Sequence, residues 1–112
     1  MIQTGDPKGN GTGGPGYKFE DELKTPHKYE VGTVAMANSG KNTNGSQFFI
    51  CTGPDCAASL NSNPNYSIFG KVTEGMDTIT KIAATPVKQG QEQSPSVPTE
   101  KVYMESIKIT EK

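Results

Sequence analysis

Residues 33–53 read TVAMANSGKNTNGSQFFICTG, and this stretch decides the fold. Its most distinctive part, QFFICT at residues 47–52, has the apolar run that is typical of a strand buried on both faces. The overlapping stretch YEVGTVAM at residues 29–36 is β-branched and apolar enough to predict a second strand. Between them, residues 37–46 are dense in turn-forming residues and predict a loop.

On the N-terminal side of this stretch, glycine dominates the sequence. Residues 5–16, GDPKGNGTGGPG, contain six Gly and two Pro, a composition that only a loop tolerates. We reject a phosphate-binding loop, because no GKS or GKT ending follows it and no strand precedes it. Residues 17–24, YKFEDELK, fit either a short strand or an irregular surface segment.

On the C-terminal side, loops alternate with regular elements. Residues 53–65 are rich in Gly, Asn, Pro and Ser and predict a loop, and residues 66–72 predict a strand. Residues 74–85 predict the one helix of the chain, because their apolar residues form a single stripe. Thr73 is its expected N-cap, and Pro86 ends it.

The last part of the chain predicts a loop and a final strand. Residues 86–100 are polar and contain Pro, so we expect a long loop there. Residues 102–110 predict a strand whose apolar parity switches at residues 105–106, as a β-bulge would cause. The sum is an antiparallel, mostly β protein with one C-terminal helix.

Composition limits the class of protein. The chain has 112 residues, which fits one domain, and only 19 of them are Leu, Ile, Val or Phe, which predicts a thin core. The net charge is −1 and no Arg is present, which argues against binding of nucleic acid or anionic membranes. No apolar run approaches the roughly 18 residues that span a bilayer. No signal peptide is visible either, so we expect a cytoplasmic location.

The two cysteines, Cys51 and Cys56, do not form a C-x-x-C motif, and the single His27 lies far away in sequence. They therefore predict neither a disulfide framework nor a metal site. We expect a buried strand thiol at Cys51 and a separate loop thiol at Cys56. Nothing in the sequence implies a cofactor.

Three segments carry a family resemblance: residues 5–22 (GDPKGNGTGGPGYKFEDE), residues 33–53 and residues 66–82 (YSIFGKVTEGMDTITKI). In this order and at this spacing they resemble the signature segments of cyclophilin-type peptidyl-prolyl cis/trans isomerases. The middle segment is the most specific of the three. The resemblance covers essentially the whole chain and implies a single cyclophilin-like domain at residues 1–112.

The resemblance also implies a fold, a cyclophilin-like antiparallel β-barrel with one C-terminal helix in this chain. Met1 matches an internal methionine of the family, so the barrel is expected to be incomplete at its N-terminal strands, and the first helix is expected to be lacking. A barrel avoids edges by closing, so an open one would expose strand edges. Self-association through such an edge is therefore expected.

For the site, the resemblance implies a catalytic set of Gln3, Asn38 and Phe49. It implies a substrate-binding set as well, which comprises Met1, Gly11, Ala37, Ser39, Gln47, Leu60 and Tyr66. Within these sets the apolar members hold the proline ring, the Gln3 amide contacts the substrate backbone, and the backbone at residues 37–39 pairs with the peptide. Taken singly, Phe49 would be core, Gln3 a solvated side chain and Asn38 a turn former.

The reaction implied by the resemblance rotates an X-Pro amide, whose barrier is roughly 18–20 kcal/mol. The principal catalytic group of the family is an arginine upstream of the position matching Met1, and this sequence contains no Arg. Losing a donor that stabilises only the transition state typically costs about 10²–10³ in rate. We therefore expect an isomerase of proline-containing peptides or unfolded proteins whose activity is impaired in the isolated chain.

Two alternatives stay open at this stage. The chain could be a proline-peptide binding module without catalysis, or a structural fragment that needs a complementing chain.

Overall fold

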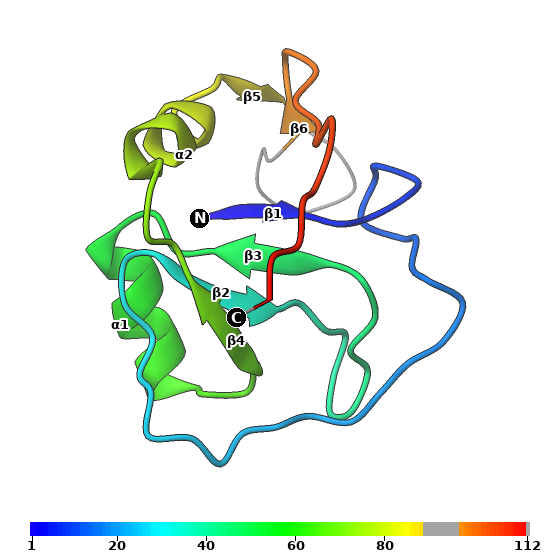
Figure 1. Cartoon of the computed structure of the whole chain (residues 1–112), viewed down its shortest axis with the longest axis vertical. Coiled ribbons are helices and arrows are strands. Elements are labelled where there is room, and N and C mark those ends of the chain that lie inside the picture. The colour runs from blue at the N-terminus through cyan, green and yellow to red at the C-terminus, as the bar shows by residue number, and fades with distance from the viewer. Residues whose placement is uncertain (89–96, 112) are drawn as a thin grey trace.

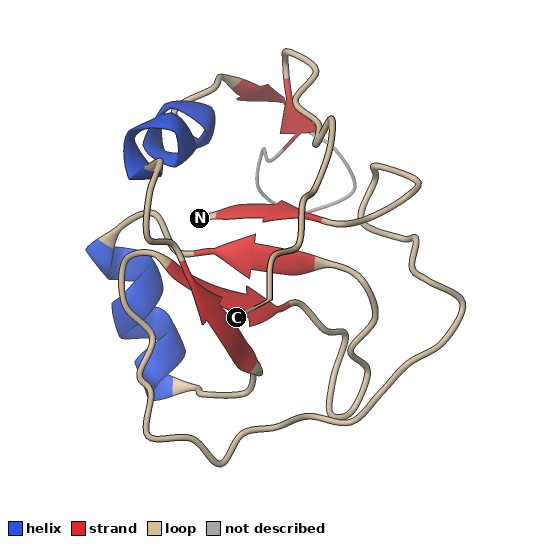
Figure 2. Cartoon of the chain, in the orientation of Figure 1, coloured by secondary structure: helices blue, strands red, loops and turns tan. Residues whose placement is uncertain are grey.

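The computed structural model describes residues 1–88 and 97–111 of the chain. Four strands form one antiparallel sheet in the order β1-β3-β2-β4 (Figure 1). They are β1 (Ile2–Thr4), β2 (Thr33–Met36), β3 (Phe48–Ile50) and β4 (Ile68–Lys71). The other elements in this part of the chain are α1 (Pro54–Ser62), α2 (Met76–Ala83) and a two-stranded pair, β5 (Val87–Lys88) and β6 (Val97–Pro98) (Figure 2).

The first face of the sheet holds the core. Phe49 of β3 and Ala35 of β2 are paired across the ladder and are 2% and 0% exposed. Tyr29 and Cys51 complete the buried cluster, and α1 covers it by packing Cys56 and Leu60 against it. The core is as thin as the composition predicts.

The second face of the sheet is apolar and more open than the first, with Phe69 exposed and its other apolar side chains partly buried. It consists of Ile2, Val34, Met36, Phe48, Ile50 and Phe69, none of which is fully buried. Phe69 reaches this face because the register shifts between Val34 and Ala35, and its ring meets Phe48 edge-on at 6.0 Å between centroids. Phe69 is nevertheless 58% exposed. Helix α2 lies against β1 at one edge of the sheet, so this face is covered only in part.

Three of the four predicted strands occur, but each is shorter than the sequence pattern indicated. The strand expected over residues 29–36 begins only at Thr33, because Gly32 has a φ of 92° and residues 30–33 form a turn. The strands expected at residues 47–52 and 66–72 are likewise reduced to β3 and β4. At residues 17–24, Phe19 forms a single bridge to Asn44.

The helix prediction was right for α2 and wrong in two other respects. The N-cap of α2 is Gly75, with a φ of 86°, and not Thr73. A second helix, α1, lies where we expected only a loop at residues 53–65. Pro54 stands in its first turn with Asp55 next to it, and both residue types favour a helix start.

The strand predicted over residues 102–110 is absent, and residues 101–111 are exposed throughout. Alternating apolar residues form a strand only where a neighbouring strand accepts the hydrogen bonds, and no described strand pairs with this segment. The loop predicted at residues 86–100 contains β5 and β6 at its two ends, and residues 89–96 lie outside the described residues. Within the described residues the strands form an open sheet and not a closed barrel.

No helix of the described chain has the length and apolar character that crossing a membrane requires.

Candidate functional site

A groove of about 920 Å³ lies between the glycine-rich segment at residues 11–18 and the loop at residues 37–47. In Figure 1 these two segments lie to the right of the sheet, beyond the end of β1 and the start of β3. Six of the ten predicted site residues line it: Gln3, Gly11, Ala37, Asn38, Ser39 and Gln47. The structure therefore brings together the polar part of the predicted site.

Gln47 ties the two walls of the groove together. Its Nε2 donates to the carbonyl oxygens of Gly11 at 3.1 Å and Gly13 at 2.8 Å. Its Oε1 accepts a hydrogen bond from Gln3 Nε2 at 3.0 Å, and its backbone carbonyl accepts one from Ala37 N at 3.0 Å. The Gln47 side chain thus joins β1 to the glycine-rich segment, and its backbone carbonyl holds the start of the loop.

Asp6 shapes the glycine-rich segment from within. Its carboxylate accepts hydrogen bonds from the backbone N–H groups of Lys8 at 2.8 Å, Asn10 at 2.9 Å and Gly11 at 2.6 Å. Burial raises the pKa of Asp6, but these backbone donors together lower it more, so its pKa lies below the ordinary value. A Cβ at Gly13 would overlap the carboxylate, so a side chain there would displace Asp6 from this arrangement.

Asn38 and Ser39 hold the opposite wall in shape. Asn38 Nδ2 donates to the carbonyl of Asn65 at 3.0 Å, and its Oδ1 accepts from Gly40 N at 3.2 Å. Ser39 N donates to Thr43 Oγ1 at 2.9 Å. The Asn38 side chain is therefore occupied in building the loop, which leaves its backbone as the part that can face a ligand.

Asn44 anchors this loop to residues 19–21, and the sequence did not single it out. It is 0% exposed, and its Nδ2 donates to the carbonyls of Phe19 and Glu20 and to Asp21 Oδ1, at 3.3, 3.1 and 3.0 Å. Its Oδ1 is buried without a hydrogen-bond partner in the described part of the chain. The sequence alone does not distinguish a buried asparagine from an ordinary turn former.

The apolar part of the predicted site lies apart from the groove. Phe49 is 2% exposed and meets the Tyr66 ring edge-on at 5.5 Å, and Leu60 packs on the same cluster from α1. Met1 is 61% exposed at the start of β1. In this structure Phe49 is a core residue that offers almost no surface to a ligand.

A clamp of polar contacts holds Tyr66 and α1 in place. Asn61 of α1 donates from Nδ2 to the Tyr29 carbonyl at 2.8 Å and accepts from Tyr29 N at 3.1 Å. The Tyr29 hydroxyl donates to the Tyr66 carbonyl and accepts from Tyr66 N at 3.1 Å. Burial raises the pKa of Tyr29. A cavity of about 420 Å³ adjoins this clamp and is lined by all three residues.

The expectation of two separate thiols was wrong. Cys51 and Cys56 form a disulfide with their Cα atoms 5.7 Å apart. The missed helix explains the error, because the first turn of α1 folds back toward the end of β3 and brings Cys56 to Cys51.

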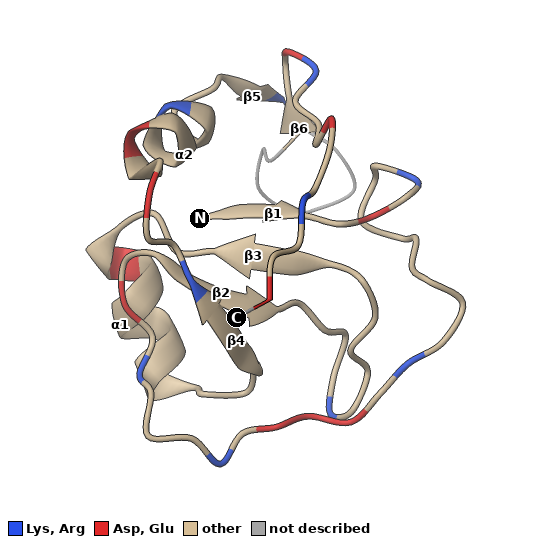
Figure 3. Cartoon of the chain, viewed as in Figure 1, with Lys and Arg blue, Asp and Glu red and all other residues tan. Residues whose placement is uncertain are grey.

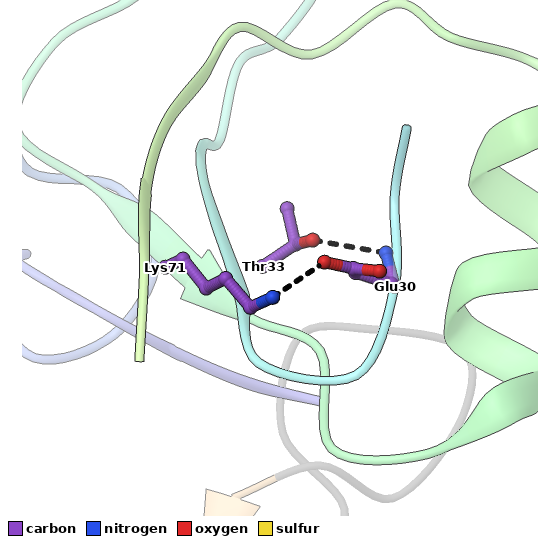
Figure 4. A network of polar contacts seen from close by, with 3 residues as sticks. All are labelled: Glu30, Thr33 and Lys71. Carbon is purple, nitrogen blue, oxygen red and sulfur yellow. Dashed lines mark hydrogen bonds and ion pairs between the residues drawn. The ribbon is translucent and has the colours of Figure 1, made fainter. Parts of the chain in front are cut away.

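Charge does not single out a site. Acidic and basic residues are interspersed over the described chain (Figure 3). On the sheet, Lys71 Nζ pairs with Glu30 Oε1 at 2.9 Å, while Glu30 N donates to Thr33 Oγ1 at 2.9 Å (Figure 4). The described residues contain no group of His, Cys, Asp and Glu suited to a metal ion.

Comparison with known proteins gives the family. The sequence pattern described as cyclophilin type peptidyl-prolyl cis-trans isomerase/CLD matches residues 1–109. The chain belongs to the cyclophilin family. It is 41% identical over 122 residues to a probable peptidyl-prolyl cis-trans isomerase B of Mycobacterium leprae, which covers 97% of this chain and 39% of that protein. It is 46% identical over 93 residues to human peptidyl-prolyl cis-trans isomerase-like 3, covering 80% and 55%.

A solved cyclophilin has the same fold. The structure of a Cryptosporidium parvum cyclophilin type peptidyl-prolyl cis-trans isomerase, determined in the presence of the dipeptide Ala-Pro, matches with a TM-score of 0.68 and 36% identity. The match covers 88% of this chain and 61% of that one. This cyclophilin chain spans about half the length of the curated relatives it matches.

Proposed function

We propose that this cyclophilin chain binds X-Pro peptides in the groove between residues 11–18 and 37–47, and that it is a peptidyl-prolyl cis/trans isomerase. The observation that carries the proposal is the Gln3–Gln47 pair, which joins both walls of the groove. The relative crystallised with Ala-Pro supports the class of ligand. The six predicted residues that line the groove are the proposed peptide contacts, and the other four, Met1, Phe49, Leu60 and Tyr66, are proposed as its apolar support.

The backbone at Ala37 and Asn38 is the proposed docking strand. An extended peptide gains affinity by pairing its main chain with that of the protein, and pockets for side chains add selectivity. Gln3 stands next to this segment, since both contact Gln47. Its amide can therefore turn from Gln47 to a peptide carbonyl without any movement of the backbone.

The chemistry requires preferential binding of the twisted amide over the planar one. The 112 residues include no Arg, the donor that the family resemblance implies for this step. A lysine lacks the planar guanidinium fork and replaces it poorly. We propose that the chain binds proline peptides but turns them over about 10²–10³ times more slowly than a cyclophilin that carries this arginine.

Two NMR measurements test binding and turnover separately. Titration of the chain with a peptide containing Ala-Pro should shift the amide resonances of Gln3, Ala37 and Asn38. Exchange spectroscopy on the same peptide, with a complete cyclophilin as reference, gives the isomerisation rate. Absence of binding at millimolar peptide would overturn the proposal, and turnover equal to the reference would overturn the expected impairment. Binding without turnover would favour a non-catalytic binding module.

Matched variants test whether Gln3 contributes to peptide binding. Gln3→Ala should weaken peptide binding about fivefold, because one hydrogen bond contributes about 1 kcal/mol. Lys41→Ala serves as the control, because Lys41 is exposed on the loop at residues 37–47 and does not line the groove. Equal affinities for the two variants would contradict the assignment of Gln3.

We also propose that the chain self-associates through the open edges of the sheet, β1 and β4, and the apolar second face supports this proposal. Phe69 of β4 is exposed on this face, and its five other apolar side chains are only partly buried. An exposed apolar patch of this kind marks an interaction surface or an aggregation liability. Sedimentation velocity should show concentration-dependent association that Phe69→Ser weakens, with Lys71→Ser as the control. A stable monomer at all concentrations would refute self-association.

A further inference from the structure

The Cys51–Cys56 disulfide is the one covalent connection between β3 and α1 apart from the main chain. It joins the residue after β3 to the first turn of the helix, across a sequence separation of 5. A link so local adds little to the topology of the whole chain. Its effect falls on the helix that it anchors.

Helix α1 depends on its attachments. It has nine residues, and none of them is buried. An isolated helix of this length is not stable in water, because the free energy cost of nucleation exceeds the gain from the hydrogen bonds of so few turns. Within the described residues it is held by the disulfide, by Leu60 against the core and by the two hydrogen bonds of Asn61 to Tyr29.

The two sulfurs differ in accessibility. Cys51 is 0% exposed in the core, whereas Cys56 is only partly buried on the surface side of the bond. An incoming thiolate therefore meets Cys56 first. Attack there expels the Cys51 sulfur as a thiolate, which takes up a proton, and leaves a mixed disulfide at Cys56.

A second thiol–disulfide exchange completes the reduction. The other thiol of the reductant attacks the mixed disulfide, releases the Cys56 thiolate and leaves the reductant as its own disulfide. The protein gains two electrons and two protons, and the dithiol loses them.

We propose that Cys51–Cys56 is a thiol–disulfide exchange site for dithiol reductants, and that its reduction releases α1 from the core. Asn61 then loses its fixed position against Tyr29, and Tyr29 is the residue that holds both backbone polar groups of Tyr66. Tyr66 in turn packs edge-on against Phe49. The disulfide thereby controls the order of the Tyr66–Phe49 pair in the core.

The state of the cysteines is read by alkylation of the full chain. Denatured under iodoacetamide without reductant, the chain should take up no label. After treatment with dithiothreitol it should take up two labels, at Cys51 and Cys56. Labelling of both cysteines in the untreated chain would overturn the proposal at its first step.

The release of α1 is read by hydrogen exchange in the folded chain. Reduction should speed amide exchange over residues 54–62 by about tenfold while the β2–β3 ladder keeps its protection, since α1 opens as a local unit. Reoxidation should restore the slow rate. Unchanged exchange in α1 on reduction would overturn the proposal. None of these readouts involves a peptide, so failure of the proposed peptide binding would leave this result unaffected.

Two variants separate the disulfide from the helix. Cys56→Ser should exchange its α1 amides fast in both redox conditions and show no response to dithiothreitol. Ser59→Ala lies on the same helix, is exposed, and should keep the full redox response. A redox response that persists in Cys56→Ser would refute the assignment. If Cys56→Ser fails to fold, the reduction and reoxidation cycle of the unmodified chain decides the question alone.

Discussion

Replacing Asn44 should reveal how the groove loop is held to the rest of the chain. Its Nδ2 group supplies three contacts, to two carbonyls and to Asp21 Oδ1, over 3.0–3.3 Å in a fully buried position. Each hydrogen bond contributes about 0.5–1.5 kcal/mol, and a buried acceptor left alone costs about 1–3 kcal/mol. Truncation also removes the unpaired Oδ1, which offsets part of the loss. We therefore expect Asn44→Ala to lower the free energy of unfolding by about 2 kcal/mol.

Asn44→Asp should lower the free energy of unfolding more than Asn44→Ala does, although aspartate is nearly the same size as asparagine. It replaces the NH₂ donor by an acceptor that faces two carbonyls and the Asp21 carboxylate at hydrogen-bond distance. A buried charge next to a like charge costs more than an empty site. The expected loss exceeds that of Asn44→Ala by at least about 1 kcal/mol.

Urea unfolding at neutral pH measures both changes, with thermal unfolding as a second probe. For a domain of this size a loss of 1 kcal/mol lowers Tm by about 4–8 °C. Asn63→Ala is the matched control, because Asn63 is exposed at the end of α1 and should change stability by less than about 0.5 kcal/mol. The reasoning fails if Asn44→Asp is as stable as Asn44→Ala, or if both match the control.

Three further outcomes are expected. Gly5→Ala should lower the free energy of unfolding by about 2–3 kcal/mol in urea titrations, because Gly5 has a φ of 88° and a Cβ there would meet a backbone carbonyl. Gly14→Ala, with open space around it, should leave the free energy of unfolding unchanged. Equal losses of stability in the two variants would contradict the clash at Gly5. An NMR titration should give the Asp6 carboxyl a pKa below the ordinary aspartate value. Its stabilisation of the glycine-rich segment is therefore complete above the ordinary pKa and disappears as the pH falls through the lowered pKa. A midpoint at or above the ordinary value would be inconsistent with the backbone contacts. Glu30→Gln should cost less than about 0.5 kcal/mol in the same urea titrations, because the pair with Lys71 is largely exposed, and a loss above 1 kcal/mol would show a stronger ion pair than its exposure allows.

The family and the central strands were predictable because they depend on local sequence. Residues 33–53 contain their own strand, loop and strand signals, and the structure places β2 and β3 as antiparallel partners there. The polar half of the proposed site followed from the same motif, since Ala37, Asn38 and Gln47 lie within it. These residues line one groove, although their roles in binding remain a proposal.

The errors came from a missing partner strand and from a helix whose composition resembles that of a loop. Residues 102–110 have a strand pattern, but a strand exists only where a partner strand is available. Helix α1 was hidden by its Asn and Ser content, although Pro54 and Asp55 marked its start. Because that helix was missed, the approach of Cys56 to Cys51 was missed too.

The open second face has a consequence for the fate of the chain in a cell. Quality-control systems survey exposed apolar surface, and the steady level of a protein falls when such surface persists. The exposed Phe69 and the five partly buried apolar side chains of this face present part of that surface in the folded state. The lifetime of this polypeptide is therefore expected to depend on how much of that face is covered, more than on how tightly its own core is packed.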